Sequence, residues 1–273
     1  VAACSGADNK ALKTDTLGIE VTPEENREYS YTDKKAGYWY GTTHQETAEW
    51  WSGWNMAKKR ILADYAIGID DDIIAKDETL NRKDAIGCVV YPDRIERHWG
   101  STKEIFQLLD NIPVLCIEMI SAADSVFCIP DLSHITDTKD SEYGLFLTPG
   151  ESPDKRILLA PARKKGFTRY GNGIKTGIGS EGFIMTYGTE EECIRLLEEF
   201  RSSGKKMKAE RKARINSLIT EYNSIRTNLP ELDKALDWIT ITMDELITEQ
   251  QGNGIYAGLP WFNEYWGRDM FIS

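Results

Sequence analysis

Short apolar runs separated by turn-forming residues fill the stretch from residue 29 to residue 188. The runs include ILADYAIGI, AIGCVVYP, IPVLCIEMI and RILLAP, and Gly, Pro, Asp and Asn lie between them. Some runs alternate with polar positions, whereas others stay apolar along their length, as buried strands do. The pattern predicts an antiparallel β domain over residues 29–188, in the form of a β-sandwich.

The next stretch, residues 189–228, has helical spacing instead. Leu197 and Phe200 share one helical face, and Thr189 stands before a run of glutamates, which is the order of an N-cap followed by an acidic first turn. Gly204 is expected to end this helix, and the Lys-rich and Arg-rich residues after it predict a second, basic helix. Residues 189–228 are therefore interpreted as a helical linker.

The last stretch, residues 229–273, opens with another predicted helix, which ends before the glycines of the sequence GNG at 252–254. Its apolar residues recur at helical spacing and predict one continuous apolar face. That face comprises Leu232, Ala235, Leu236, Ile239, Met243, Leu246 and Ile247.

Composition and charge narrow the function classes. The formal net charge of −11 and the pI of about 4.9 argue against a nucleic-acid partner, because phosphate binding requires clustered Lys and Arg. No run of eighteen apolar residues is present, so no membrane-spanning helix is expected. Aromatic residues make up 10% of the chain and include eight Trp, which suits stacking on a ligand, although core packing accounts for aromatic residues equally well.

The amino-terminal sequence VAACSGADNKALKTDT resembles the signal box of bacterial lipoproteins, with Cys4 as the lipidated residue. On this interpretation residues 1–28 are a signal remnant and flexible tether, and the protein lies in the cell envelope, held to the membrane only by its lipid. Cys4→Ser would then release the protein from membranes. The alternatives are a chance match of four residues and a cytoplasmic location.

The other four cysteines are Cys88, Cys116, Cys128 and Cys193, and none has the Cys-x-x-Cys spacing of a zinc or redox site. Buried free thiols are the favoured interpretation because the first three lie in apolar runs. A disulfide between two of the four stays open. No metal and no cofactor is expected.

The most specific chemistry lies in the closing sequence GLPWFNEYWGRDMFIS. Trp261, Phe262 and Trp266 supply flat apolar faces beside the charged pair Arg268 and Asp269. A pyranose ring presents apolar C–H patches and rows of hydroxyls, so this combination suits a sugar subsite in which Asp269 accepts and Arg268 donates. The alternative is a structural role, with the Arg–Asp pair fixing a helix N-terminus and the Trp residues packing on it.

Two stretches carry a resemblance to a known family. The sequence IYAGLPWFNEYWGRDMFIS, preceded by LDKALDWITITMDELITEQ, resembles the start of the catalytic domain of glycogen debranching enzymes of the amylo-α-1,6-glucosidase type. The stretch GYWYGTTHQETAEWWSGWNMAKKRILADY is similar to the opening of that family's β-sandwich domain. One departure is Met270, where the family usually has Thr.

The resemblance implies a multidomain β + α protein: an antiparallel β-sandwich, a helical linker and, in residues 229–273, the first helical hairpin of a truncated (α/α)6 toroid. The implied substrate is an α-glucan or oligosaccharide. Arg268 and Asp269 would bind its terminal glucosyl unit, and Trp261, Phe262 and Trp266 would line the wall. The reaction is expected to invert, with an acid and a base about 6.5–9.5 Å apart that later hairpins supply.

No catalytic pair is therefore expected within this sequence, which by itself is expected to be inactive. Its last helix should rest on the β domain or expose apolar surface. His44 and Glu46 lie in an aromatic-rich stretch and are weaker candidates for sugar contact, since a lone His is more often packed or surface-exposed. The rival function is a non-catalytic carbohydrate-binding lipoprotein.

Overall fold

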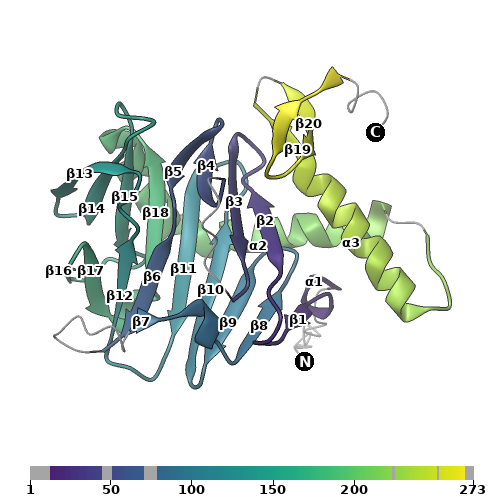
Figure 1. Ribbon diagram of the computed structural model, residues 1–273, viewed down its shortest axis with the longest axis horizontal. Helices are drawn as coiled ribbons and strands as arrows, with labels where there is room; N and C mark the ends of the chain where they lie inside the picture. Colours follow the sequence, from purple (N-terminus) through teal and green to yellow (C-terminus); the bar gives the residue numbers. More distant parts are fainter. Residues whose placement is uncertain (1–12, 45–50, 71–78, 223–224, 251, 268–273) are drawn as a thin grey trace, which may run out of the picture.

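The computed structural model describes residues 13–44, 51–70, 79–222, 225–250 and 252–267. Figure 1 shows the sheets at one end and a long helix, α3, which leads into a small sheet next to β2 and β3. Cys4, Glu46, Arg268 and Asp269 lie outside the described residues.

The largest sheet has nine strands, each antiparallel to its neighbours. In spatial order they are β1 (Ile19–Val21), β8 (Gly87–Val90), β9 (Ile95–Trp99), β10 (Thr102–Leu108), β11 (Val114–Ile120), β18 (Phe183–Gly188), β15 (Arg156–Pro161), β14 (Leu145–Pro149) and β13 (Ile135–Asp140).

Two smaller antiparallel sheets form the facing layer. One has four strands: β2 (Glu28–Thr32), β3 (Gly37–Thr42), β4 (Gly53–Met56) and β5 (Lys59–Leu62). The other has five: β16 (Phe167–Tyr170), β17 (Gly173–Gly177), β12 (Ser125–Pro130), β6 (Tyr65–Ile69) and β7 (Thr79–Leu80). One core cluster joins side chains of all three sheets, among them Trp54, Phe106 and Val126. The predicted antiparallel β-rich domain is thus confirmed.

The central strands of the large sheet are buried on both faces. Along β15, Ile157 and Leu159 belong to the core between the sheets, whereas Leu158 and Ala160 belong to a second cluster under helix α2. Side chains of a strand alternate between faces, so an unbroken apolar run is what a strand covered on both sides requires. This explains why runs such as RILLAP show no polar alternation.

Helix α2 (Glu190–Ser217) packs on the outer face of that sheet. Thr189 caps it as predicted, in a capping box with Glu192. The expected break at Gly204 is wrong, because α2 runs through it. The ring of Phe200 occupies the space that a side chain at Gly204 would need: an added Cβ would lie 2.6 Å from it. A π-helical turn, Leu218–Tyr222, follows α2.

The amino-terminal segment is structured from Lys13 on, where a flexible tether was expected. Helix α1 (Lys13–Thr16) and strand β1 lie in it, and Leu17 belongs to a third apolar cluster with Ile215, Ile219 and Ile241. The Trp238 indole N–H also donates to the Leu17 carbonyl at 3.0 Å. These contacts with distant helices give the segment a packing role that its own polar sequence does not reveal.

Helix α3 (Pro230–Leu246) reverses the predicted orientation. Its buried residues are Asp237, Ile241 and Glu245, whereas much of the predicted apolar face is exposed, including Ile239 at 59%. Ion pairs offset the desolvation cost of the buried carboxylates, since Asp237 pairs with Lys13 at 2.6 Å and with Arg226 at 2.9 Å. The helix therefore rests on the β domain and also exposes apolar surface.

A three-stranded sheet follows α3: β19 (Ile247–Glu249), β20 (Asn253–Gly258) and β21 (Phe262–Tyr265). A second helix was expected at this position to complete a helical hairpin. Residues 247–265 form this sheet, in which Tyr256 of β20 is buried and the ring of Tyr265 packs on it at 5.8 Å. The second helix therefore stays a prediction.

Candidate functional site

Strand β21 and its flanks present three predicted sugar-contacting side chains to solvent. Trp261 and Phe262 are each 54% exposed, and Trp266 is 43% exposed. Phe262 and Trp266 contact each other edge to face, with ring centroids 6.5 Å apart. We call Trp261, Phe262 and Trp266 the aromatic ledge.

Side chains of β21 alternate between an exposed face and a face that packs on the small sheet. The supporting residue Tyr265 faces the small sheet, where its hydroxyl donates to the Thr248 carbonyl at 2.5 Å and accepts from the Gln250 N–H at 3.1 Å. Phe262 is at odd spacing from Tyr265 in β21 and is directed to the opposite side, where Trp266, just past the strand, contacts it. The sheet thus fixes the backbone that carries the ledge.

The β domain contacts the ledge through residues of its aromatic-rich stretch. The ring of Trp51 meets Trp261 edge to face at 5.5 Å. The Asn263 amide donates to the Tyr38 hydroxyl at 3.0 Å. Lys58 and Glu264 form an exposed ion pair at 2.5 Å. Two stretches that are more than two hundred residues apart in sequence, and that both carry the family resemblance, therefore meet at one surface.

His44 lies near the start of this stretch but is 1% exposed. Its ring Nδ1 is 3.2 Å from the Thr43 hydroxyl, its backbone N–H donates to Asn26, and burial lowers its pKa. From this position the ring does not reach solvent, which favours the packed alternative.

A buried guanidinium holds the chain just before His44. Arg97 of β9 donates to the carbonyls of Thr42 and Thr43 at 3.2 and 2.9 Å, and it pairs with Glu104 at 3.1 Å. Arg97 and Glu104 are both fully buried, and the Tyr65 hydroxyl also donates to Glu104. This cluster was not predicted, although charged residues in otherwise apolar strands mark it in the sequence.

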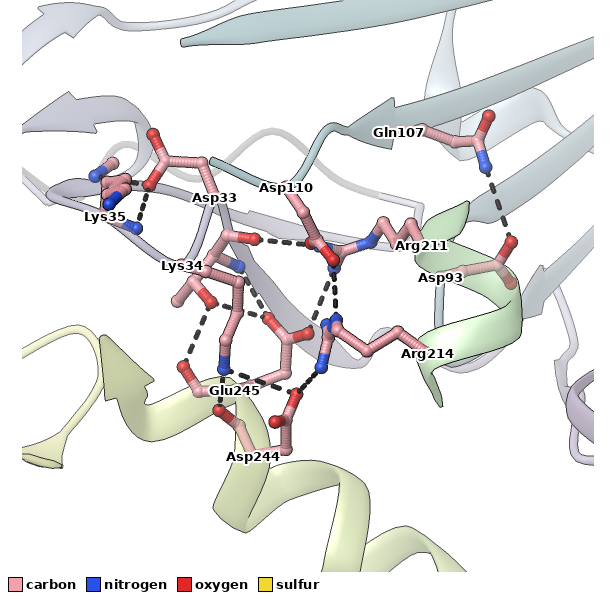
Figure 2. Close-up of polar contacts among 12 residues, drawn as sticks. Asp33, Lys34, Lys35, Asp93, Gln107, Asp110, Arg211, Arg214, Asp244 and Glu245 are labelled. Carbon is pink, nitrogen blue, oxygen red and sulfur yellow. Dashed lines mark hydrogen bonds and ion pairs between the residues drawn. The ribbon is translucent and has the colours of Figure 1, made fainter. Parts of the chain in front are cut away.

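A second buried network fixes α3 against the β domain (Figure 2). Arg211 of α2 lies at its centre, donating to Asp110, to Glu245 of α3 at 3.0 Å and to the Thr32 carbonyl at 3.1 Å. Glu245 also accepts the Thr32 N–H at 2.6 Å. One guanidinium therefore connects α2, α3 and both sheet layers.

Arg214 and Lys34 extend this network. Arg214 bridges Asp110 and Asp244, each at 2.6 Å, and Lys34 lies 3.3 Å from Asp244. Burial acts to raise the pKa of Asp110, but Arg211 and Arg214 hold that pKa below its ordinary value. We call Asp110, Arg211, Arg214, Asp244, Glu245 and Lys34 the interdomain ion network.

Asp33, at the margin of the network, behaves differently. Its Oδ1 accepts from the N–H groups of Lys35 and Gly37, at 2.8 and 2.9 Å, but Oδ2 is buried and has no hydrogen-bond partner in the described part of the chain. Burial raises the pKa of Asp33 to about 7. The side chain is therefore largely protonated in weakly acidic solution.

The aromatic ledge is an exposed surface that the small sheet holds in place. Glu264, which lies between two ledge residues in sequence, forms an ion pair with Lys58.

The described residues contain no group of three or more His, Cys, Asp or Glu side chains that could hold a metal ion. In the same residues, no helix is long and apolar enough to cross a membrane. The predicted buried free thiols are confirmed at all four described cysteines.

Comparison with known proteins gives one finding. The family model described as Amylo-alpha-1,6-glucosidase matches residues 219–273, which include α3, the small sheet and the aromatic ledge. The comparison with curated proteins gave no match. The matched segment is thus similar to a glycoside hydrolase family over the part of the chain that carries the ledge.

Proposed function

We propose that this chain is the β domain and the beginning of the catalytic domain of a glycoside hydrolase that acts on α-glucans, of the amylo-α-1,6-glucosidase type. The observation that carries the proposal is that the segment matched by the family model is also the one that exposes the aromatic ledge.

The ledge has the chemistry of a saccharide-binding wall. Exposed aromatic faces bind the apolar C–H patches of pyranose rings, and an edge-to-face contact holds Phe262 and Trp266 in place before a ligand arrives. Trp51 would extend the wall from the β domain. On the sequence resemblance, Arg268 and Asp269 bind the terminal glucosyl hydroxyls next to this wall.

The exposed face of α3 supports a larger helical domain. Leu232, Ile239 and Met243 are 44%, 59% and 41% exposed along one helix, and soluble proteins rarely leave such a stripe uncovered. We propose that further helices pack on it, as in an (α/α)6 toroid. Those helices would supply the general acid and the general base of an inverting reaction.

Asp269→Asn tests the proposal in the protein that contains this sequence and its complete catalytic domain. Hydrogen bonds from a charged group contribute about 1.5–3 kcal/mol, so kcat/KM for glucose release from an α-1,6-linked oligosaccharide should fall about ten- to a hundredfold. The melting temperature should stay the same. Full activity with a lower melting temperature would show that Asp269 is a structural residue and contradict its role in sugar binding.

A further inference from the structure

A cavity of about 580 Å³ lies between α2 and the outer face of the nine-stranded sheet. Its walls come from β11, β18, the start of the loop after β15, and the middle of α2, which Figure 1 shows behind the sheets. None of its lining residues belongs to the aromatic ledge or to the interdomain ion network. The proposed glycosidase function leaves this cavity without a role.

The cavity gathers positive charge on a strongly acidic chain. Two glutamates, Glu118 and Glu181, face five cationic lining side chains, although the whole chain carries a net charge of −11. The cationic residues are Arg163, Arg201, Lys205, Lys206 and Lys208. A local excess of this sign attracts anions.

Several of these cations are already paired. Arg163 lies 2.7 Å from Glu181, Lys208 lies 2.8 Å from Glu118, and Arg201 lies 2.9 Å from Glu198. Lys206 has only a distant partner, Glu210, at 3.6 Å. Arg163, Lys208 and Arg201 are thus closely paired, whereas the pair of Lys206 is longer.

Lys205 is the cation that stays free. It is exposed and forms no ion pair with any residue that the structure describes. Lys205 and Lys208 both act to lower the pKa of Glu181, after the hydrogen bond from Arg163, which has the largest effect. Lys205, Lys208 and Arg163 therefore all act on the carboxylate of Glu181, which lines the cavity with them.

Helix α2 presents these groups in a fixed geometry. Arg201, Lys205 and Lys208 are spaced by four and three residues, so they share one helical face. Gly204 lies on the same side, and the absence of its side chain lets the ring of Phe200 fold along the helix. Ser202, which is exposed, and Ser203, which is half-buried, also line the cavity.

We propose that this cavity binds a small phosphate-bearing ligand. Lys205 and Arg163 would contact the phosphate oxygens, and the hydroxyls of Ser202 and Ser203 would donate to the same oxygens. Arg163 would be shared between Glu181 and the ligand, since its guanidinium has five donors. Inorganic phosphate and the phosphate ester of a sugar offer the same oxygens, and both fit this chemistry.

Isothermal titration calorimetry on the full 273-residue chain tests the proposal. The probes are inorganic phosphate, a hexose phosphate and the same hexose without phosphate. The two phosphates should bind and the plain hexose should not. A hexose phosphate that binds more tightly than inorganic phosphate identifies a sugar ester as the ligand, whereas equal affinities identify free phosphate.

Lys205→Gln and Arg163→Gln should each weaken phosphate binding about tenfold, because each removes a charge-assisted hydrogen bond. Lys83→Gln is the matched control: this lysine is also exposed, lies on another element and should leave binding unchanged. Absence of phosphate binding, or equal binding by the Lys205→Gln variant and the control, would overturn the proposal. Binding to anionic lipid vesicles that phosphate does not compete away would also overturn it.

Discussion

Replacing Arg211 by Met tests the interdomain ion network. The guanidinium is 1% exposed and donates to Asp110, Glu245 and the Thr32 carbonyl. Methionine keeps most of the aliphatic volume, so the loss of folding free energy comes from the polar contacts that the guanidinium makes. Removing one partner of a buried ion pair costs about 3–5 kcal/mol. We expect about 3 kcal/mol, since Asp110 keeps Arg214 and Glu245 keeps the Thr32 N–H.

The assay is urea denaturation, followed by tryptophan fluorescence and far-ultraviolet circular dichroism on the same samples. Arg195→Met is the control, because Arg195 lies on the same helix but pairs with Glu199 at the surface; it should cost less than about 0.5 kcal/mol. In addition, Glu245→Gln should cost less in the Arg211→Met background than alone. Equal losses of stability for Arg211→Met and Arg195→Met would refute the reasoning.

Three further predictions concern buried groups. Asp33 has a pKa of about 7 in the folded state against an ordinary value of 3.8, so the folded state holds the proton more tightly. The free energy of unfolding should therefore fall as pH rises from about 4 to 7, by up to about 4 kcal/mol. Denaturation curves measured across that pH range should lose this fall in the Asp33→Asn variant. Gly204→Ala should destabilise by about 1 kcal/mol despite the higher helix propensity of Ala, because its Cβ would strike Phe200. Ser202→Ala, at a nearby exposed position of the same helix, should not, and thermal melts of both variants decide this. Burial raises the pKa of Cys88 and Cys193 to about 11 and of Cys116 to about 12, so in a Cys4→Ser variant these thiols should react with a thiol reagent at pH 8 only after denaturant is added. Rapid labelling of that variant in its native state would contradict their burial.

Much of the β domain was predictable because strand burial leaves a direct mark on the sequence. The unbroken run RILLAP corresponds to β15, which has a core on each face, and the Thr189 cap marks the start of α2. Local rules failed where a distant contact decided the outcome. Gly204 does not end its helix but lies inside α2, where the ring of Phe200 occupies the space of a side chain.

The orientation of α3 could not be read from its own amphipathicity. A stripe of apolar residues normally marks the buried face, yet here the buried face carries Asp237 and Glu245. Its stability depends on Lys13 and Arg211, which are distant in the sequence. The same limitation hid the contact of Trp51 with Trp261, although both residues were visible as members of aromatic-rich stretches.

The central claim is that the aromatic ledge binds saccharide, and calorimetric titration of the 273-residue chain with a branched malto-oligosaccharide tests it most directly. Truncating an aromatic residue at the centre of a binding surface costs about 2 kcal/mol, so Trp261→Ala should weaken binding about thirtyfold. Trp99→Ala, on strand β9 away from the ledge, should leave the affinity unchanged. Equal affinities of the unmodified chain and the Trp261→Ala variant, or no binding by the unmodified chain, would contradict the account.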